Sequence, residues 1–274
     1  MKTIWVLHRT STKLGDKLES CTKNLRRHQM AAMGNERHLA AGSTEPPPPK
    51  QDVLRVYSMK FCPFAQRLKL VLAAKAVKHE TVNIDLTKKP QWFLEKNPRG
   101  LVPAIEINGD VIYESDITSE YIDEVHPGRK IVTADPLKRA KELMLMGDHG
   151  KTVGGFYGAI LAQDDEKRAA AFTKMAAGLD VLDKFLSNSS TPFVCGEQPG
   201  FTDYMMWPHL ERIHIFIKPA LTNFKNVQAY IAKMEKDEAV QACRLPDELH
   251  KVFAEGYKTK NIDYDIGDVV EYNF

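Results

Sequence analysis

The run YSMKFCPFAQRLKLVLAAKA at residues 57–76 decides the fold, because it sets a cysteine directly before a proline at the start of a helical pattern. Its apolar residues recur on one face of a helix, while Gln66 and Arg67 point elsewhere. The preceding run LRVYS (54–58) alternates like a short strand, and HETVNID (79–85) has the pattern of a second strand. A strand, a helix and a strand at this spacing predict a βαβ unit with two parallel strands.

The pattern continues through one more α-β-β-α set. It predicts a helix at 89–97, strands at 101–107 and 110–114 joined by Asn108-Gly109, and a helix at 115–126. The order β-α-β-α-β-β-α is that of a thioredoxin-like domain, which we assign to residues 51–130.

Beyond this domain the strand patterns stop and helical periodicity dominates. Helices are predicted at 137–146, 166–186, 203–217, 227–236 and 247–257, so residues 131–274 form an all-α domain. The run GDHGKTVGG (147–155) contains Gly-Lys-Thr, but Leu145 stands where a phosphate-binding loop needs its first glycine. We therefore interpret this run as glycine-rich helix.

Residues 1–50 differ from the rest in charge and composition. They hold nine Lys and Arg against four Asp and Glu, and STEPPPPK (43–50) predicts an extended polyproline spacer. The segment up to Met30 resembles a mitochondrial presequence in its basic character, but Asp16 and Glu19 argue against one. We expect a disordered extension or an alternative start region, with Met33 as a second candidate start.

Composition excludes several functional classes. The chain carries a net charge of +2, and residues 1–50 account for +5, so the remaining 224 residues sum to −3 and predict no nucleic-acid surface. No apolar run reaches the roughly 18 residues that a membrane helix needs. Four cysteines without a C-x-x-C pair indicate a reducing compartment, and we expect a cytoplasmic location. Nine histidines without metal-ligand spacing predict no metal site.

Cys62 is the predicted reactive group. It occupies the cap of the first helix, and Pro63 takes the first helical position, where a missing N–H costs nothing. Helix N-termini lower the pKa of a cysteine to about 3.5–7.5, so we expect a thiolate at neutral pH. Ala65 stands where a C-x-x-C motif has its second thiol, so the thiol that regenerates Cys62 must come from another molecule, and glutathione is the intracellular one.

Two further motifs predict a site for a peptide with an amino-acid head group. Pro103 opens a strand, where thioredoxin-like folds have a cis proline that faces the thiol and leaves the Val102 backbone to pair with an extended peptide. Ser115 is a natural helix cap behind which amides bind a carboxylate, and Glu114 is placed to accept from an ammonium. The alternatives are an ordinary edge-strand proline and a plain helix cap.

The motifs FCPFAQR, NPRGLVPAIE and VIYESDITSEYIDE, with the helical half, resemble the omega class of glutathione transferases over residues 38–257. The resemblance implies that Cys62 forms a mixed disulfide with glutathione, walled by Phe64. It implies that Val102 and the cis Pro103 bind the cysteinyl backbone. The other implied contacts are Lys89 to the glycyl carboxylate, Glu114 and Ser115 to the γ-glutamyl head, and Arg212, His250 and Tyr257 in the second-substrate pocket.

The resemblance also implies the activity and the partners. Members are cytosolic dimers that reduce dehydroascorbate, mixed disulfides and methylated arsenic species, and some insect members act on pterins. Glutathione is then the co-substrate, no metal is needed, and no stable membrane insertion is expected. One departure is Gly200, where the family has a Ser or Thr cap, with Thr202 as a substitute.

Two alternatives remain open at this stage. The first is a chloride-intracellular-channel-like protein of the same fold, which shares the CPF-x-Q-R motif but generally lacks the Glu-Ser pair. The second is a non-enzymatic scaffold with an idle site, for which the Cys62 thiol would have an ordinary pKa near 8.5.

Overall fold

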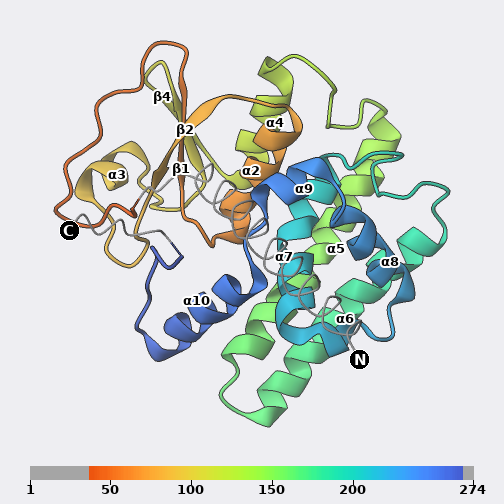
Figure 1. Cartoon of the computed structure of the whole chain (residues 1–274). Helices are drawn as coiled ribbons and strands as arrows, with labels where there is room; N and C mark the ends of the chain where they lie inside the picture. Colours follow the sequence, from red (N-terminus) through yellow and green to blue (C-terminus); the bar gives the residue numbers. More distant parts are fainter. Residues whose placement is uncertain (1–36, 268–274) are drawn as a thin grey trace, which may run out of the picture. The chain divides into compact units, whose positions relative to one another are not determined.

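A four-stranded sheet forms the first half of the structure, a computed structural model that describes residues 37–267. Its strands are β1 (Leu54–Ser58), β2 (His79–Asn83), β3 (Ala104–Ile107) and β4 (Asp110–Tyr113), in the order β2-β1-β3-β4. Strands β1 and β2 are parallel, whereas β1–β3 and β3–β4 are antiparallel (Figure 1). The predicted βαβ unit and hairpin are thus confirmed.

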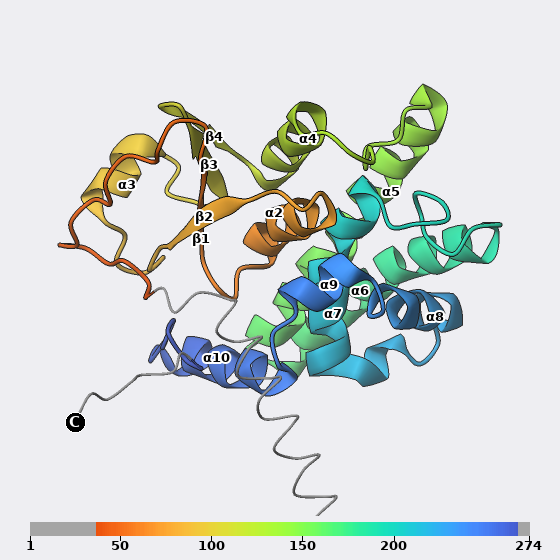
Figure 2. The same ribbon diagram turned by 45° about the horizontal axis from the view of Figure 1, so that its top comes forward.

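Helices cover both faces of this sheet. Helices α2 (Pro63–Ala74) and α4 (Ser115–Val125) lie on one face and α3 (Gln91–Lys96) on the other (Figure 2). All five residues of β1 are buried, as expected of a central strand covered on both sides. Val56 packs in the cluster with α2, and Tyr57 packs with Phe93 of α3.

Residues 38–50 contribute to the folded unit, although they precede the expected domain start at residue 51. The Leu39 amide donates to the Asn83 carbonyl at 2.8 Å, and the Leu39 carbonyl accepts from the Asp85 amide at 2.9 Å. The Trp92 indole donates to the Ser43 carbonyl at 3.1 Å. The part of the predicted extension before residue 37, like the tail after residue 267, lies outside the described residues.

The second half is all-helical, as predicted. Its elements are α5 (Pro136–Leu161), α6 (Asp165–Ser187), α7 (Phe201–Ile217), the 3-10 turn η1 (Lys218–Leu221), α8 (Lys225–Met234), α9 (Glu238–Cys243) and α10 (Asp247–Thr259). Helix α5 continues through 147–155, which confirms the helical interpretation of the glycine-rich run. At Gly155 a Cβ would lie 2.4 Å from the Met175 amide nitrogen, so the glycine permits close packing against α6. Among the described helices, none is long and apolar enough to span a bilayer.

Helix α7 is the central helix of this half, and a buried carboxylate secures its first turn. Asp203 is fully buried and accepts from the amides of Gly200 and Val194, both at 2.9 Å, and of Cys195 at 3.1 Å. The Tyr230 hydroxyl of α8 donates to the same carboxylate at 2.8 Å. The start of α7, the preceding loop and α8 are therefore joined through one side chain.

The departure at Gly200 has a steric cause. A Cβ at this position would lie 2.5 Å from the Cys195 Cβ and 2.9 Å from the Ile131 carbonyl oxygen. A Ser or Thr cap does not fit there. Gly200 is therefore the N-cap residue, and no side chain of its own caps the helix. Thr202 lies inside the helix and is not the cap; Asp203 bonds the cap amide instead.

Candidate functional site

Cys62 stands at the position predicted for it. It is the N-cap of α2, with φ −72° and ψ 120°, and Pro63 follows at the first helical position. The Sγ atom accepts from the Ala65 amide at 3.5 Å and lies 3.8 Å from the Val102 carbonyl oxygen. The helix end therefore presents its unpaired amides to the sulfur, as the sequence indicates.

The predicted lowering of the Cys62 pKa is wrong for this structure. Cys62 is only 8% exposed, and burial raises the pKa of its thiol above the ordinary value. The Ala65 and Phe64 amides act in the opposite direction, as does the charge of Arg212, but they do not outweigh desolvation. The Cys62-Pro63 motif predicts that the cysteine lies at a helix end, whereas the burial of its sulfur depends on residues far away in the chain.

The loop before β3 brings a second predicted element to the thiol. The Val102–Pro103 peptide bond is cis, as expected. Both residues are buried, and the Val102 carbonyl points toward Cys62. Asn97, fully buried, anchors the loop by donating to the Leu101 carbonyl at 2.8 Å.

Glu114 and Ser115 meet at the start of α4 in a different arrangement from the one predicted. Glu114 is the N-cap residue, in the left-handed region at φ 77°, and Ser115 is the first helical residue. A non-glycine residue at positive φ is a strained conformation of the kind that clusters at functional sites. Glu114 pairs with Arg99 at 2.7 Å, and Ser115 Oγ accepts from Arg67 at 3.2 Å.

Sequence reasoning missed the role of two polar residues of α2. Arg67 donates to the Met205 carbonyl of α7 at 2.7 Å as well as to Ser115, so it connects three helices. Gln66 is 7% exposed and donates to Glu211 at 2.8 Å. The prediction that both point away from the packed face is wrong, because α7 covers their side of α2. The periodicity of α2 alone carries no signal of that helix.

Lys89 and Phe64 lie beside other segments of the predicted site. Lys89 is half-buried, and its Nζ lies 3.3 Å from the position of a Cβ on Gly100, in the loop before Pro103. Phe64 is 38% exposed, its ring lies 5.2 Å from that of His209, and the Arg67 guanidinium lies 4.8 Å from its centre. An exposed aromatic two residues after the thiol is a suitable wall for a bound molecule.

The three residues predicted for a second-substrate pocket differ in exposure. Arg212 is 5% exposed and donates to the Phe61 carbonyl at 2.8 Å and to Gln66 Oε1 at 2.7 Å. His250 is 4% exposed, packs edge-on against the Phe61 ring, and has its pKa lowered to about 3 by burial. Tyr257 is 53% exposed on α10. Arg212 and His250 thus support the cysteine loop from behind, and only Tyr257 is open to solvent.

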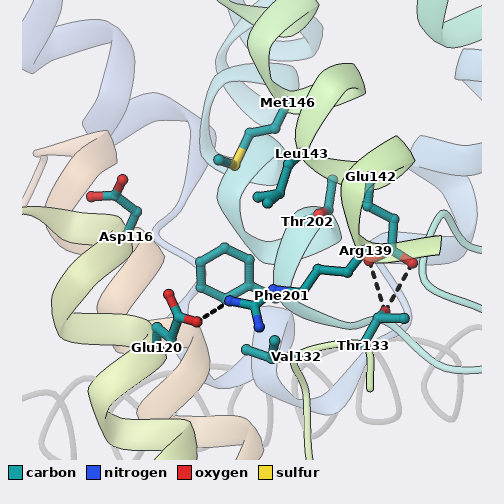
Figure 3. Close-up of a pocket in the computed structure, with 10 residues that line it drawn as sticks. All are labelled: Asp116, Glu120, Val132, Thr133, Arg139, Glu142, Leu143, Met146, Phe201 and Thr202. Carbon is teal, nitrogen blue, oxygen red and sulfur yellow. Dashed lines mark hydrogen bonds and ion pairs between the residues drawn. The ribbon is translucent and has the colours of Figure 1, made fainter. Parts of the chain in front are cut away.

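A cavity of about 80 Å³ lies away from Cys62, between α4 and α5. Its lining includes Glu120 paired with Arg139, and Glu142 bonded to the Thr133 hydroxyl (Figure 3). Burial raises the pKa of the Glu142 carboxyl. Within residues 37–267, no cluster of three or more His, Cys, Asp or Glu side chains is arranged to hold a metal ion.

His149 of α5 makes the stability sensitive to acid. It is buried, and burial together with the Arg67 charge lowers its pKa to about 3. In the unfolded chain the His149 side chain has a pKa near 6.5, so it takes up its proton there first as the pH falls. The stability that His149 contributes above pH 6.5 is therefore lost as the pH falls toward 3. Between pH 6.5 and 5 this one group costs about 2 kcal/mol. Urea unfolding should show that the free energy of unfolding falls less between pH 7 and pH 5 for His149→Phe than for the wild type. An equal fall in both proteins would contradict this role of His149.

The sequence matches two family models. Residues 56–130 match the glutathione S-transferase N-terminal domain, and residues 152–243 match the glutathione S-transferase C-terminal domain. The first range contains Cys62, Lys89, Pro103 and Ser115, so the residues predicted to bind glutathione all lie in the matched N-terminal domain.

Individual relatives give the class. The chain is 38% identical over 232 residues to pyrimidodiazepine synthase of Drosophila melanogaster, covering 81% of this chain and 93% of the relative. It is 36% identical over 214 residues to glutathione S-transferase omega-1 of Sus scrofa, covering 77% and 89%. The solved structure of glutathione transferase Omega 3C from Trametes versicolor matches with a TM-score of 0.64 and 26% identity, over 78% of this chain and 94% of that one. These similarities do not favour the chloride-channel-like alternative. The chain belongs to the omega class of glutathione transferases.

Proposed function

We propose that the protein is a glutathione-dependent thioltransferase and dehydroascorbate reductase whose nucleophile is Cys62. The observation that supports this most is the Cys62 sulfur at the amides of α2, 3.8 Å from the carbonyl before Pro103. With no second cysteine at Ala65, the chemistry needs an external thiol. A reducing cytoplasm, rich in glutathione, is the proposed location.

The thioltransferase reaction has one covalent intermediate, the mixed disulfide between Cys62 and glutathione. The Cys62 thiol first loses its proton to solvent. The thiolate attacks the glutathionyl sulfur of a mixed disulfide, forms a bond to it and releases the other sulfur as a thiolate, which takes up a proton. The thiolate of a second glutathione then attacks the glutathionyl sulfur on Cys62. This step releases oxidised glutathione and restores the Cys62 thiolate.

The glutathione site proposed here uses the residues around this sulfur. Glu114 and Ser115 bind the γ-glutamyl head, and the Val102 backbone beside Pro103 binds the cysteinyl part. Lys89 reaches the glycyl carboxylate, with Phe64 as the wall. Arg99, paired with Glu114 at 2.7 Å, and Arg67, bonded to Ser115, orient the two head-group residues.

The proposal also names the second substrates that react with glutathione at this site. We include methylated arsenicals, which a thiol can reduce, together with dehydroascorbate. A second candidate is pyrimidodiazepine synthesis, because the relative with that name is 38% identical over most of the chain. Turnover of each substrate by the purified full-length protein with glutathione, followed by intact mass of the protein, tests the proposal. We expect a species that is heavier by one glutathione and that disappears with excess glutathione.

We further propose a homodimer formed through the surface of α4 and α5. Four large apolar side chains there are exposed: Ile117 at 53%, Leu137 at 67%, Leu143 at 42% and Met144 at 71%. Residues of both helices line the cavity in Figure 3, so α4 and α5 lie next to each other there. An apolar surface of this kind marks an interaction site.

Met144→Lys is expected to weaken this dimer at least about a hundredfold, because a lysine charge would be desolvated at the centre of the interface. Light scattering after size exclusion should report a dimer for the wild type and a monomer for the variant. Val252→Lys introduces the same charge at an apolar residue of α10 that is 51% exposed and lies outside α4 and α5, and it should leave the dimer intact. A monomeric wild type at micromolar concentration would contradict the proposal.

A further inference from the structure

Hydrogen bonds from several of its backbone groups fix the turn that carries Cys62. The Cys62 amide donates to the Met59 carbonyl at 3.0 Å, which closes a four-residue turn between β1 and α2. The Phe61 amide donates to the Met59 sulfur at 3.1 Å, and the Phe61 carbonyl accepts from Arg212 at 2.8 Å. The amide of Lys60 remains, and a β-turn supplies no acceptor of its own for its second residue.

His38, some twenty residues earlier in the chain, supplies that acceptor. The Lys60 amide donates to Nε2 of His38 at 3.2 Å. The His38 side chain is only 2% exposed, so solvent does not compete for this bond. On the other side of the ring, Nδ1 lies 2.7 Å from Oδ1 of Asp265, which also accepts from the His38 amide at 2.9 Å.

These contacts determine the tautomer of His38. An amide N–H can donate to Nε2 only if that nitrogen carries a lone pair, so the ring proton is on Nδ1. Nδ1–H then donates to the Asp265 carboxylate. A histidine oriented by a carboxylate in this way presents its other nitrogen in a fixed direction. Asp265 thus aims Nε2 at the amide two residues before Cys62.

Asp265 itself is fixed against the same loop. Its neighbour Tyr264 is 7% exposed, and the Tyr264 ring lies 5.2 Å from His38 and 5.8 Å from Phe253. Phe253 in turn stacks on Phe61, with ring centres 4.2 Å apart. The Lys60 ammonium donates to the Ile266 carbonyl at 2.9 Å. The segment at 262–266 therefore packs on the turn through apolar and polar contacts.

We propose that His38 and Asp265 are positioning residues for Cys62, which hold the Lys60 amide and with it the sulfur in its reactive place. The inference rests on the proposed role of Cys62 as nucleophile. Neither residue touches the sulfur, so they act through the backbone of the turn. Neither Cys62 nor its flanking motif needs to change for reactivity to be lost.

Two substitutions of His38 separate its two bonds. In His38→Asn the amide nitrogen replaces Nδ1 and keeps the bond to Asp265, but the acceptor for Lys60 is lost. In His38→Gln the longer side chain can place an acceptor oxygen near Nε2. We expect His38→Asn to slow alkylation of Cys62 by iodoacetamide, and kcat with glutathione, about tenfold, since misplacement of a reacting group by 1 Å can cost about a hundredfold. His38→Gln should recover to within about threefold of the wild type.

Asp265→Ala is a second variant, distant from the sulfur. We expect it to slow alkylation of Cys62, and kcat with glutathione, by the same factor of about ten. Asp165→Asn, at a carboxylate that is 98% exposed, is the matched control and should react like the wild type. Thermal unfolding midpoints measured on all variants separate positioning from stability. Wild-type alkylation rates in His38→Asn and Asp265→Ala would overturn the inference, even if their midpoints fall. If a variant does not fold, hydrogen exchange of the wild-type Lys60 amide decides: the inference requires strong protection, and free exchange rejects it.

The same assays distinguish this inference from the proposed function. An active Cys62→Ala protein would reject Cys62 as nucleophile, whatever the His38 variants do. An inactive Cys62→Ala protein beside a fully reactive His38→Asn protein would reject only the positioning role.

Discussion

Cys62→Ala is expected to lower glutathione-dependent reduction of hydroxyethyl disulfide and of dehydroascorbate by at least about a thousandfold, because it removes the sulfur that forms the proposed covalent intermediate. The substitution removes one sulfur from a site that is 8% exposed and leaves the N-cap backbone in place. The variant should still be retained on glutathione-agarose, since the proposed contacts of Val102, Glu114 and Ser115 remain. The measurement is kcat/KM for each substrate, with intact mass to detect the mixed disulfide.

The two other cysteines within residues 37–267 provide the controls for this experiment. Burial raises the pKa of Cys243 to about 12, and it raises the pKa of Cys195 as well. Cys243 is the last residue of α9 and Cys195 lies in the loop before α7, so neither thiol has the helix N-terminal amides that Cys62 has. Cys243→Ala should therefore retain wild-type turnover and should still form one mixed disulfide. Undiminished turnover in Cys62→Ala would show that another group performs the reaction.

Local patterns predicted most of the elements because each depends on nearby residues. Strand β1 occupies the expected residues 54–58, and α4 ends one residue before its expected end. Helix α5 covers both the helix predicted at 137–146 and the glycine-rich run at 147–155, and it ends at Leu161. Gly155 and Gly158 are tolerated there because they pack closely against α6. The short helix α9 was not predicted.

The candidate site could be predicted only where the neighbouring residues in the sequence indicate the role of a residue. A cysteine before a proline, and a proline at a strand start, gave Cys62 and the cis bond at Pro103 directly. The burial that raises the Cys62 pKa, and the bonds of Arg212 to the cysteine loop, depend on α7 packing on α2 from nearly 150 residues away. The pair His38–Asp265 joins residues 227 apart, and no local motif marks it.

Asp203→Ala is expected to lower the free energy of unfolding by about 3–5 kcal/mol, the largest stability effect that we predict for a single side chain. Four donors lose their acceptor: the amides of Gly200, Val194 and Cys195, and the Tyr230 hydroxyl. A buried donor left without a partner costs about 1–3 kcal/mol, and partial relaxation makes the sum smaller than four such penalties. Urea unfolding followed by circular dichroism measures the change.

Two further variants grade this effect by the number of donors affected. Tyr230→Phe removes one donor and keeps the carboxylate, so it should cost about 1 kcal/mol. Asp203→Asn retains one acceptor oxygen but turns an NH₂ group toward amides that donate, so its cost should lie between those of the other two. A loss below about 1 kcal/mol in Asp203→Ala would mean that water replaces the carboxylate. In that case the start of α7 would be stabilised by the apolar packing of the helix and not by this one buried charge.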